Sequence, residues 1–521
     1  MSDLKDASSG RTSPADLGPH PKSKAKMNKF AILCAILASM SSILLGYADT
    51  AVMSGAAIYI KDNFKLSEVQ VEILVGIINL YSLIGAAAAG RTSDLIGRRY
   101  TMVLAGVIFF VAAVLMGFAP NYGFLMFGRF VAGIGVGYAL MIAPVYTTEV
   151  APTSSRGFLT SFPEVFINGG VLVGYVSNYA FFKLPTHLGW RFMLGIGVFP
   201  SAFLILIVLI MPESPRWLVM QGRLADATSV LRRTSDSPHE AQLRLADIKQ
   251  AAGIPPDCTD DVIHLPKRRR SGKGVWKDLF LRPTPTVRHI LISAIGIHFF
   301  QQASGVDAVV LYSPRIFEHA GITSSNHKLL ATMAVGFSKT IFILVATFLL
   351  DRIGRRPLLL ASVTGKIVSL VTLGFGIMIV NRRRWAVGLC IAMVLSDVGF
   401  FSIGMGPIAW VYSSEIFPLK LRAQGVSVGV IVNRVTSGVV GMTFISLYQA
   451  VTISGAFFLF AGVAVVSWLF FYFVLPETHG RTLEEIEGLF GNFLWKFGKN
   501  GDVNVEKNEG EVQLGLSNPT V

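Results

Sequence analysis

The chain has 521 residues, of which 52% are hydrophobic and only 15% are charged, with a formal net charge of +14. A soluble chain of this length carries about 25% charged residues and buries its apolar residues in two or more cores. With a mean hydropathy of +0.56, this composition argues against a soluble protein. The basic residues cluster between apolar runs, which indicates membrane topology and excludes a nucleic-acid partner.

Taken in chain order, the apolar residues come in runs of about 20, the length of a helix that crosses a lipid bilayer. The runs lack the alternation of a membrane β-barrel. We therefore expect an all-α polytopic membrane protein. Twelve spans are predicted, at residues 29–55, 70–91, 100–119, 122–148, 157–181, 190–211, 288–316, 328–350, 357–380, 385–413, 423–447 and 453–475.

Polar segments flank and divide the spans. The stretch between the sixth and seventh spans contains a helical pattern around Leu224–Arg233 and the basic run Lys267–Arg270. The start of the chain is polar and does not resemble a cleavable signal peptide. The predicted organisation is a disordered cytoplasmic N-terminus (1–28), an N-terminal six-helix half (29–211), a cytoplasmic linker with short helices (212–287), a C-terminal six-helix half (288–475) and a cytoplasmic tail (476–521).

The basic residues also predict the orientation. With an even number of spans, one side of the membrane receives both termini together with Lys22, Lys24, Lys26, Lys29, Arg98, Arg99, Arg156, Lys267–Arg270, Arg355, Arg356, Lys420 and Arg422. The positive-inside rule assigns that side to the cytoplasm. Arg382–Arg384 contradict the rule, but late loops weigh less in setting topology. We expect a multi-pass protein of the plasma membrane, with a vacuolar location left open.

An internal repeat divides the chain into two similar halves. Gly90–Arg99 in the first half matches Asp351–Arg356 in the second. After each motif comes a Glu with an Arg seven positions later, and then a Pro-Glu pair: Glu149, Arg156 and Pro212-Glu213 in the first half, Glu415, Arg422 and Pro476-Glu477 in the second. Three paired features in one order indicate two parallel six-helix halves around a central cavity.

These motifs resemble the signature set of sugar porters of the major facilitator superfamily. The set also includes Gly128-Arg129, Pro212–Leu218, Gln301-Gln302-x-x-Gly305 and Pro476-Glu477-Thr478, and it extends from residue 46 to about residue 490. Ser161–Asn168 and Gln301–Phe317 look more narrowly like plant polyol (sorbitol/mannitol-type) proton symporters. The resemblance implies the major facilitator fold, a small polyhydroxylated solute as cargo, and the proton as coupling ion with no other cofactor.

Charged residues inside the spans are candidates for the transport path, because each costs about 2.5–3.5 kcal/mol on insertion scales. They are Asp49, Arg129, Glu164, Asp307, Lys339, Asp397 and Arg434. The resemblance implies that Asp49 and Arg129 form the proton-coupling pair. Here Ala48 separates Tyr47 from Asp49, unlike the family's Gly-Tyr-Asp. Because one residue turns a helix by about 100°, either the helix is locally unwound or Asp49 is displaced.

The predicted cargo ligands include Gln301 and Gln302, because a buried amide both donates to and accepts from hydroxyl groups. Gly305 permits a break in the same helix. The resemblance adds Tyr312, Trp410 as a stacking aromatic, and Asn433. Glu164 and Asp307 replace the Gln and Asn of hexose porters, and such acidic acceptors suit a linear polyol. Lys339 is a candidate to neutralise one of these acids. The competing interpretation is a set of interhelical hydrogen bonds without cargo.

The loop charges resemble the family's cytoplasmic charge network, which implies a gate that forms and breaks during transport. The competing interpretation is solvated charge, worth under about 1 kcal/mol per pair. The predicted gate residues are Asp94, Arg98, Glu149, Arg156, Glu213, Asp351, Arg355, Glu415, Arg422 and Glu477.

The leading hypothesis is proton-coupled symport of a polyol or a monosaccharide by alternating access. A facilitative uniporter of the same fold and a non-transporting solute sensor are the alternatives. The sequence lacks a zinc signature, a nucleophile elbow and a phosphate-binding Gly-Lys-Ser/Thr loop, so we do not expect an enzyme. The spacing of Cys34, Cys258 and Cys390 matches no metal or redox site. The identity of the cargo and the oligomeric state stay open.

Overall fold

The computed structural model describes residues 28–152, 156–252, 254–255, 262, 277–281, 283–380, 383, 385–417, 421–478 and 490. The side chains of Asp49, Arg156, Asp351 and Arg422 lie outside this description, although their backbones are described. Cys258 lies outside it altogether, as does almost all of the predicted N-terminal segment and of the predicted tail.

The first half and the connection that follows it are built from helices. They are α1 (Lys29–Gly46), the π-helix η2 (Tyr47–Ala51), α2 (Val52–Phe64), α3 (Glu68–Ile96), α4 (Arg98–Gly117), α5 (Tyr122–Val150), α6 (Arg156–Thr160), α7 (Phe162–Phe181), α8 (Thr186–Gly195), α9 (Val198–Val208), α10 (Pro215–Met220), α11 (Leu224–Thr234), α12 (Pro238–Ala252) and the π-helix η4 (Lys277–Leu281). The helical pattern around Leu224–Arg233 coincides with α11.

The second half repeats this architecture. Its helices are α13 (Pro285–Ala303), α14 (Val306–Leu311), α15 (Ser313–His319), α16 (Ser325–Ile353), α17 (Arg355–Ile379), α18 (Trp385–Phe400), the π-helix η5 (Phe401–Met405), α19 (Gly406–Ile416), α20 (Arg422–Val451) and α21 (Ile453–Val474). Among the described residues, eleven helices are long and apolar enough to cross a membrane. The predicted seventh span is the remaining one, and it is divided into α13, α14 and α15.

Local sequence explains where several of these helices begin. The Asn28 side chain accepts hydrogen bonds from the Phe30 and Ala31 amides at the start of α1. Ser67 and Gln70 form a reciprocal capping box at the start of α3. These side chains satisfy amide groups that have no partner inside the helix. Within a bilayer, the helix also satisfies all its remaining backbone groups internally, which is why apolar runs fold this way.

Several spans deviate from regular helix, and the sequence accounts for the deviations in the first and seventh spans. At the position of the extra residue Ala48, the first span forms η2, so the insertion is absorbed as a local π-helix. This span is also longer than predicted, because α2 continues to Phe64. The seventh span breaks at Gly305, as predicted, where φ is +84°. That backbone conformation favours glycine.

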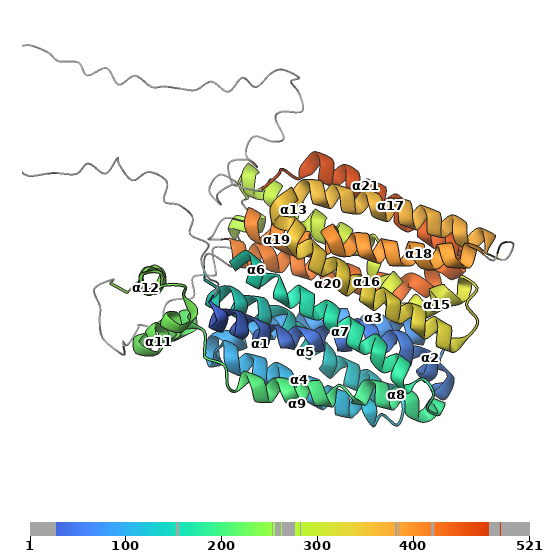
Figure 1. Cartoon of the computed structure of the whole chain (residues 1–521), viewed down its shortest axis with the longest axis horizontal. Coiled ribbons are helices and arrows are strands. Elements are labelled where there is room, and N and C mark those ends of the chain that lie inside the picture. Colours follow the sequence, from blue (N-terminus) through green and yellow to red (C-terminus); the bar gives the residue numbers. More distant parts are fainter. Residues whose placement is uncertain are drawn as a thin grey trace, which may run out of the picture.

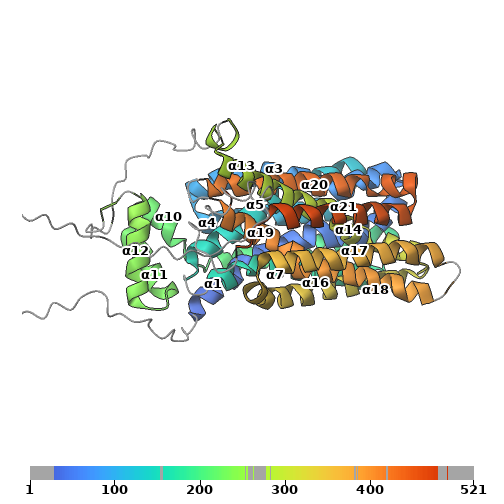
Figure 2. The same cartoon turned by 90° about the horizontal axis from the view of Figure 1, so that it is seen from above.

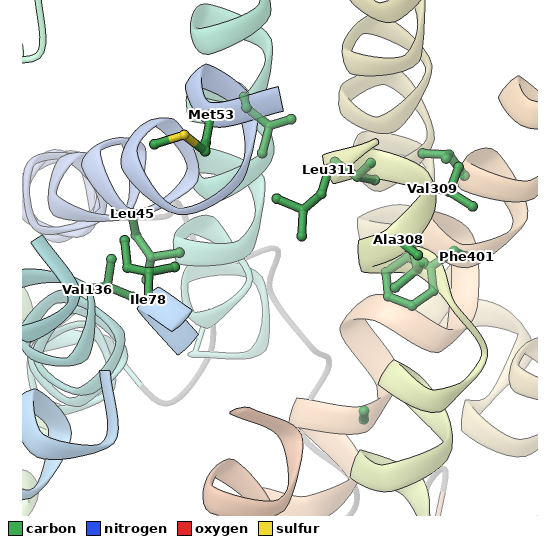
Figure 3. Close-up of a cluster of buried hydrophobic side chains, with 14 of the residues drawn as sticks. Leu45, Met53, Ile78, Val136, Ala308, Val309, Leu311 and Phe401 are labelled. Atoms are coloured by element: carbon green, nitrogen blue, oxygen red, sulfur yellow. The ribbon is translucent and has the colours of Figure 1, made fainter. Parts of the chain in front are cut away.

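The two halves lie side by side along the bundle (Figure 1, Figure 2). Within the halves, α3 packs against α5, and α17 packs against α21. Between the halves, α3 packs against α20, and α7 packs against α16. Figure 3 shows apolar side chains of both halves that belong to one buried cluster, with Leu45, Ile78 and Val136 gathered in the N-terminal half.

Helices α11 and α12 lie beyond one end of the bundle (Figure 1). We name this the linker end, and we name the opposite end, where α2, α8 and α15 lie, the far end. Asn28 Nδ2 donates to the carbonyl oxygens of Arg233 (3.0 Å) and Ser235 (2.7 Å). Arg244 of α12 donates to the Glu149 and Val150 carbonyls at the end of α5, both at 3.2 Å. These bonds attach the linker helices to the N-terminal half.

Candidate transport site

The predicted amide ligands meet where α13 faces α20. Asn433 Nδ2 donates to Gln301 Oε1 at 2.7 Å, and Gln302 Nε2 donates to Asn433 Oδ1 at 3.3 Å. All three residues are buried. Gln302 Oε1 has no hydrogen-bond partner among the described residues. Because a buried acceptor without a partner is costly, this oxygen is suited to a hydroxyl donor.

One face of α20 meets the whole length of the broken seventh span. Residues four apart on a helix share a face, and here such residues contact successive turns of the span. Asn433 pairs with Gln301, the hydroxyl of Ser437 donates to Asp307, and the Gly441 carbonyl accepts from the Tyr312 hydroxyl at 2.6 Å. The structure therefore brings Asp307 and the glutamine pair to one line of polar contacts.

Tyr312 lies at the far-end limit of this line. Its side chain is only 3% exposed, and its ring stacks on Phe444 with the centroids 5.3 Å apart. The Tyr312 hydroxyl is already bound to the Gly441 carbonyl, so this side chain joins the end of α14 to α20. Its predicted role as a cargo ligand stays a prediction.

Trp410 follows the π-helix η5 and is half-buried. The ring of His298 packs edge-on against it, with the centroids 5.0 Å apart. His298 is fully buried, and its Nε2 lies 2.9 Å from Ser413 Oγ. Since that hydroxyl donates to the Ala409 carbonyl, Nε2 is assigned as the donor to Ser413. His298, which the sequence analysis missed, thus supports the predicted stacking aromatic.

Glu164 lies in the first turn of α7, where the charges of Lys339 and Arg434 act on its carboxylate. The predicted neutralising partner, Lys339, is therefore one of two nearby cations. Arg434 of α20 also donates to Asn79 Oδ1 of α3 at 3.0 Å, so it bridges the halves. The Asn168 side chain donates to the Glu164 carbonyl at 2.8 Å. An acid and two bases from both halves thus share this region.

Arg129 of α5 is fully buried. Its guanidinium donates to the carbonyl oxygens of Leu74 (3.1 Å) and Val75 (3.0 Å) on α3, and of Ala48 (2.9 Å) on η2. The inserted residue thus supplies a backbone oxygen to the predicted coupling arginine. The Asp49 side chain lies outside the described residues, so the coupling pair itself stays a prediction.

Four of the predicted gate residues of the first half, Asp94, Arg98, Glu149 and Glu213, form one cluster at the linker end. Arg98 donates to both carboxylate oxygens of Glu149, at 3.0 and 3.1 Å. The Ser214 hydroxyl donates to the same Glu149 at 2.5 Å. Glu213 accepts from the backbone amides of Arg98 and Arg99 at the start of α4. Asp94 is mostly exposed and lies 3.4 Å from Arg98.

The second half repeats this arrangement at the equivalent positions. Arg355 donates to Glu415 at 3.0 Å, and the Thr478 hydroxyl donates to the same carboxylate at 2.9 Å. Glu477 accepts from the amides of Arg355 and Arg356 at the start of α17. A carboxylate at a helix N-terminus interacts favourably with the helix dipole. All these pairs join helices of one half.

Burial affects the chemistry of the first capping carboxylate. It raises the pKa of Glu213, while hydrogen bonds from the amides of Ser214, Arg99 and Arg98 act in the opposite direction. Gly97, with φ of +93°, lets the carboxylate approach the chain, because a Cβ there would lie 2.4 Å from Glu213 Oε2. The side chains of Arg156, Asp351 and Arg422 lie outside the described residues.

Contacts between the halves at the far end were missed by the sequence analysis. Arg315 Nη1 of α15 lies 2.6 Å from Glu68 Oε2 of α3. Glu72, one turn after Glu68, accepts from the Ser446 amide (2.8 Å) and hydroxyl (2.6 Å). We name these four residues the far-end closure. The available signal was the spacing of two acidic residues, Glu68 and Glu72, in the first two turns of a membrane-spanning helix.

Comparisons with known proteins agree with this architecture. The family model described as sugar (and other) transporter matches residues 34–490. Polyol transporter 5 of Arabidopsis thaliana is 62% identical over 505 residues, which cover 96% of this chain and 92% of that protein. Putative polyol transporter 2 of the same plant is 65% identical over 475 residues, covering 90% and 93% respectively.

Solved structures give the same picture. The proton:xylose symporter XylE bound to 6-bromo-6-deoxy-D-glucose aligns with a TM-score of 0.73 at 26% identity, covering 89% of this chain and 100% of that chain. An inward-open conformation of XylE from E. coli aligns with a TM-score of 0.71 at 26% identity, covering 88% and 99%.

The charge cluster of the first half at the linker end predicts a contrast between a buried pair and an exposed pair. Glu149→Gln leaves the buried Arg98 without its anionic partner, which is expected to cost about 3–5 kcal/mol of stability. Asp94→Asn alters a mostly exposed pair and is expected to cost less than about 1 kcal/mol. Thermal unfolding of the purified protein in detergent should show a lower Tm for Glu149→Gln alone. Equal Tm values for both variants would show that the buried Glu149–Arg98 pair stabilises the protein no more than the exposed Asp94–Arg98 pair.

The far-end closure predicts that Arg315→Ala separates the halves at that end, because it removes an ion pair between α15 and α3. The measurement is the distance between spin labels at Val69 and Asn326, both exposed at the far end, in a protein without its native cysteines. The distribution should shift to longer distances. Lys61→Ala is the matched control, because Lys61 pairs with Glu68 inside one half. A shift of the same size in the control would contradict the closure.

Proposed function

Because this chain belongs to the sugar (and other) transporter family of the major facilitator superfamily, we propose that it imports a polyol together with protons. Members of this family are membrane transporters, so the chain is a transporter and not an enzyme. The choice of a polyol follows the names of two relatives, polyol transporter 5 and putative polyol transporter 2, which are 62% and 65% identical to it over the aligned residues. Monosaccharides belong to the same chemical class of cargo.

The observation that carries the proposal is the polar line between the seventh span and α20. It offers hydroxyl groups an unpaired amide oxygen on Gln302, the amide groups of Gln301 and Asn433, and the carboxylate of Asp307. Glu164 adds a second carboxylate from the other half. Charged acceptors bind hydroxyl donors about twice as strongly as neutral ones. A linear polyol, which presents donors along its length and has no ring oxygen, fits this set.

Proton coupling is assigned to Asp49 and Arg129. Arg129 is anchored on carbonyls of α3 and of η2, directly beside Asp49 in the chain. A protonated Asp49 no longer attracts the guanidinium, so Arg129 shifts its bonding between η2 and α3. Because η2 is an irregular turn of the first span, this change alters how that span packs in its half. The neighbour XylE is described as a proton:xylose symporter.

Alternating access follows from the different contacts at the two ends. The far-end closure holds the halves together at one end, which we assign to the outside of the cell. The linker end is assigned to the cytoplasmic side of the plasma membrane, and both termini are assigned to the same compartment. There the charge clusters Arg98–Glu149 and Arg355–Glu415 stabilise each half as a unit. We propose that the gate residues form further contacts across the halves when the cytoplasmic side is shut.

The coupling assignment predicts that Asp49→Asn abolishes concentrative uptake, because the neutral side chain no longer responds to protons. Purified protein in liposomes should take up labelled sorbitol against its gradient when a pH gradient is imposed, and the variant should not. Exchange of sorbitol across the membrane without a pH gradient should persist in the variant. This exchange serves as the control for folding and cargo binding.

Two other outcomes contradict the proposal. Undiminished concentrative uptake by Asp49→Asn would remove this residue from the coupling mechanism. Wild-type uptake that does not depend on the pH gradient would identify the protein as a uniporter of the same fold.

The carboxylates predict the selectivity of the site. Glu164→Gln and Asp307→Asn restore the amides of hexose porters. They should lower the affinity for sorbitol about tenfold, since a loss of about 1.4 kcal/mol of binding free energy is a factor of ten in affinity. The affinity for glucose should fall less, because the ring oxygen of glucose accepts a hydrogen bond from the new amide. Competition for labelled sorbitol in liposomes measures both affinities, with glucose as the internal control. Equal losses for the two solutes would assign the carboxylates to coupling or structure instead of selectivity.

A further inference from the structure

A buried ion pair lies in the C-terminal half, outside the contacts described for cargo. Lys366 of α17 and Asp397 of α18 are both fully buried, and their Nζ and Oδ1 atoms are 2.8 Å apart. The second oxygen of Asp397 has no hydrogen-bond partner among the described residues. Removing two charges from water offsets most of their attraction, so stability alone does not account for such a pair.

The pair lies beside the π-helix η5 of the tenth span. Lys366 Nζ is 5.6 Å from the ring centroid of Phe401, the first residue of η5. One turn earlier on α17, the Ser362 hydroxyl donates to the Phe400 carbonyl at 2.6 Å and accepts from the Met405 amide at 3.1 Å. Helix α17 therefore holds η5 at both of its ends.

The other side of η5 faces the cargo site. Gln301 Nε2 donates to the carbonyl oxygens of Met405 (3.1 Å) and Gly406 (2.9 Å). Because the same amide accepts from Asn433 through its oxygen, its orientation is fixed by these carbonyls. The backbone at the end of η5 thus determines how Gln301 is presented.

We propose that Lys366 and Asp397 are positioning residues for the cargo site, which act by holding η5 in its π-helical form. A π-helix inside an α-helix is rare and needs such support. If η5 relaxes to an α-helix, the residues after it turn by about 100°, and the carbonyls at Met405 and Gly406 leave Gln301. The inference rests on the proposed function, in which Gln301 binds cargo.

The first test measures η5 without any cargo. The double variant Lys366→Met, Asp397→Leu removes both charges together, so no unpaired charge stays buried. Hydrogen exchange of the amides of residues 399–406, followed by mass spectrometry, should become about tenfold faster. The control is Cys390→Ala, which changes a buried residue of α18 that faces Gly376 and not η5. The control should exchange like the wild type.

The second test measures equilibrium binding of sorbitol to the same proteins. The dissociation constant should rise about fivefold in the double variant and in Ser362→Ala, and the two changes combined should be less than additive, because both act through η5. If the double variant does not fold, hydrogen exchange and sorbitol binding are measured instead on Ser362→Ala and on the charge-retaining variant Lys366→Arg.

The outcomes separate this inference from the proposed function. Unchanged exchange in η5, or faster exchange with unchanged sorbitol affinity, overturns the positioning role. Additive effects of the pair and Ser362 also overturn it. Wild-type protein that binds no polyol contradicts the proposed function, and the exchange measurement then decides alone whether the pair holds η5.

Discussion

A polar group inside the hydrocarbon core of a membrane has no water to bind, so its partner must come from another helix. The contact between α20 and the broken seventh span depends on this constraint. Along it, polar groups at steps of one helical turn pair across the two helices, from the glutamine pair to Tyr312. A solute that enters the site competes for these bonds with its own hydroxyl groups, which links binding to the packing of both helices.

The two ends of the bundle follow different rules. At the linker end, each half contains its own copy of an arginine–glutamate pair, and a second glutamate accepts from the amides at the start of the helix that carries the arginine. These contacts keep each half rigid. At the far end, Glu68 and Glu72 of α3 contact residues of the other half. A rigid half that is joined to its partner by a few breakable contacts is the arrangement that alternating access requires.

Irregular helices lie beside the residues that we propose for proton coupling and cargo binding. The π-helix η2 supplies the Ala48 carbonyl to Arg129, and the π-helix η5 supplies two carbonyls to Gln301. Regular helices use most of their carbonyls internally, so a local departure from the α-helix makes further carbonyls available. Each departure needs support from neighbouring helices, which explains polar contacts such as Ser362 with η5.

The sequence by itself determined the helical class, the family fold and the break at Gly305, because apolar length, repeated motifs and a permissive glycine are local properties. It also predicted Gln301 and Asn433 as cargo ligands and the paired loop charges as a gate; the structure brings the residues of each set together, and their roles stay predictions. Only the tertiary structure decided that Ala48 forms a π-helix, that Glu68 meets Arg315, and that Asp397 pairs with Lys366. These outcomes depend on which helices become neighbours, and residues far apart in the chain carry no local pattern that specifies such pairs.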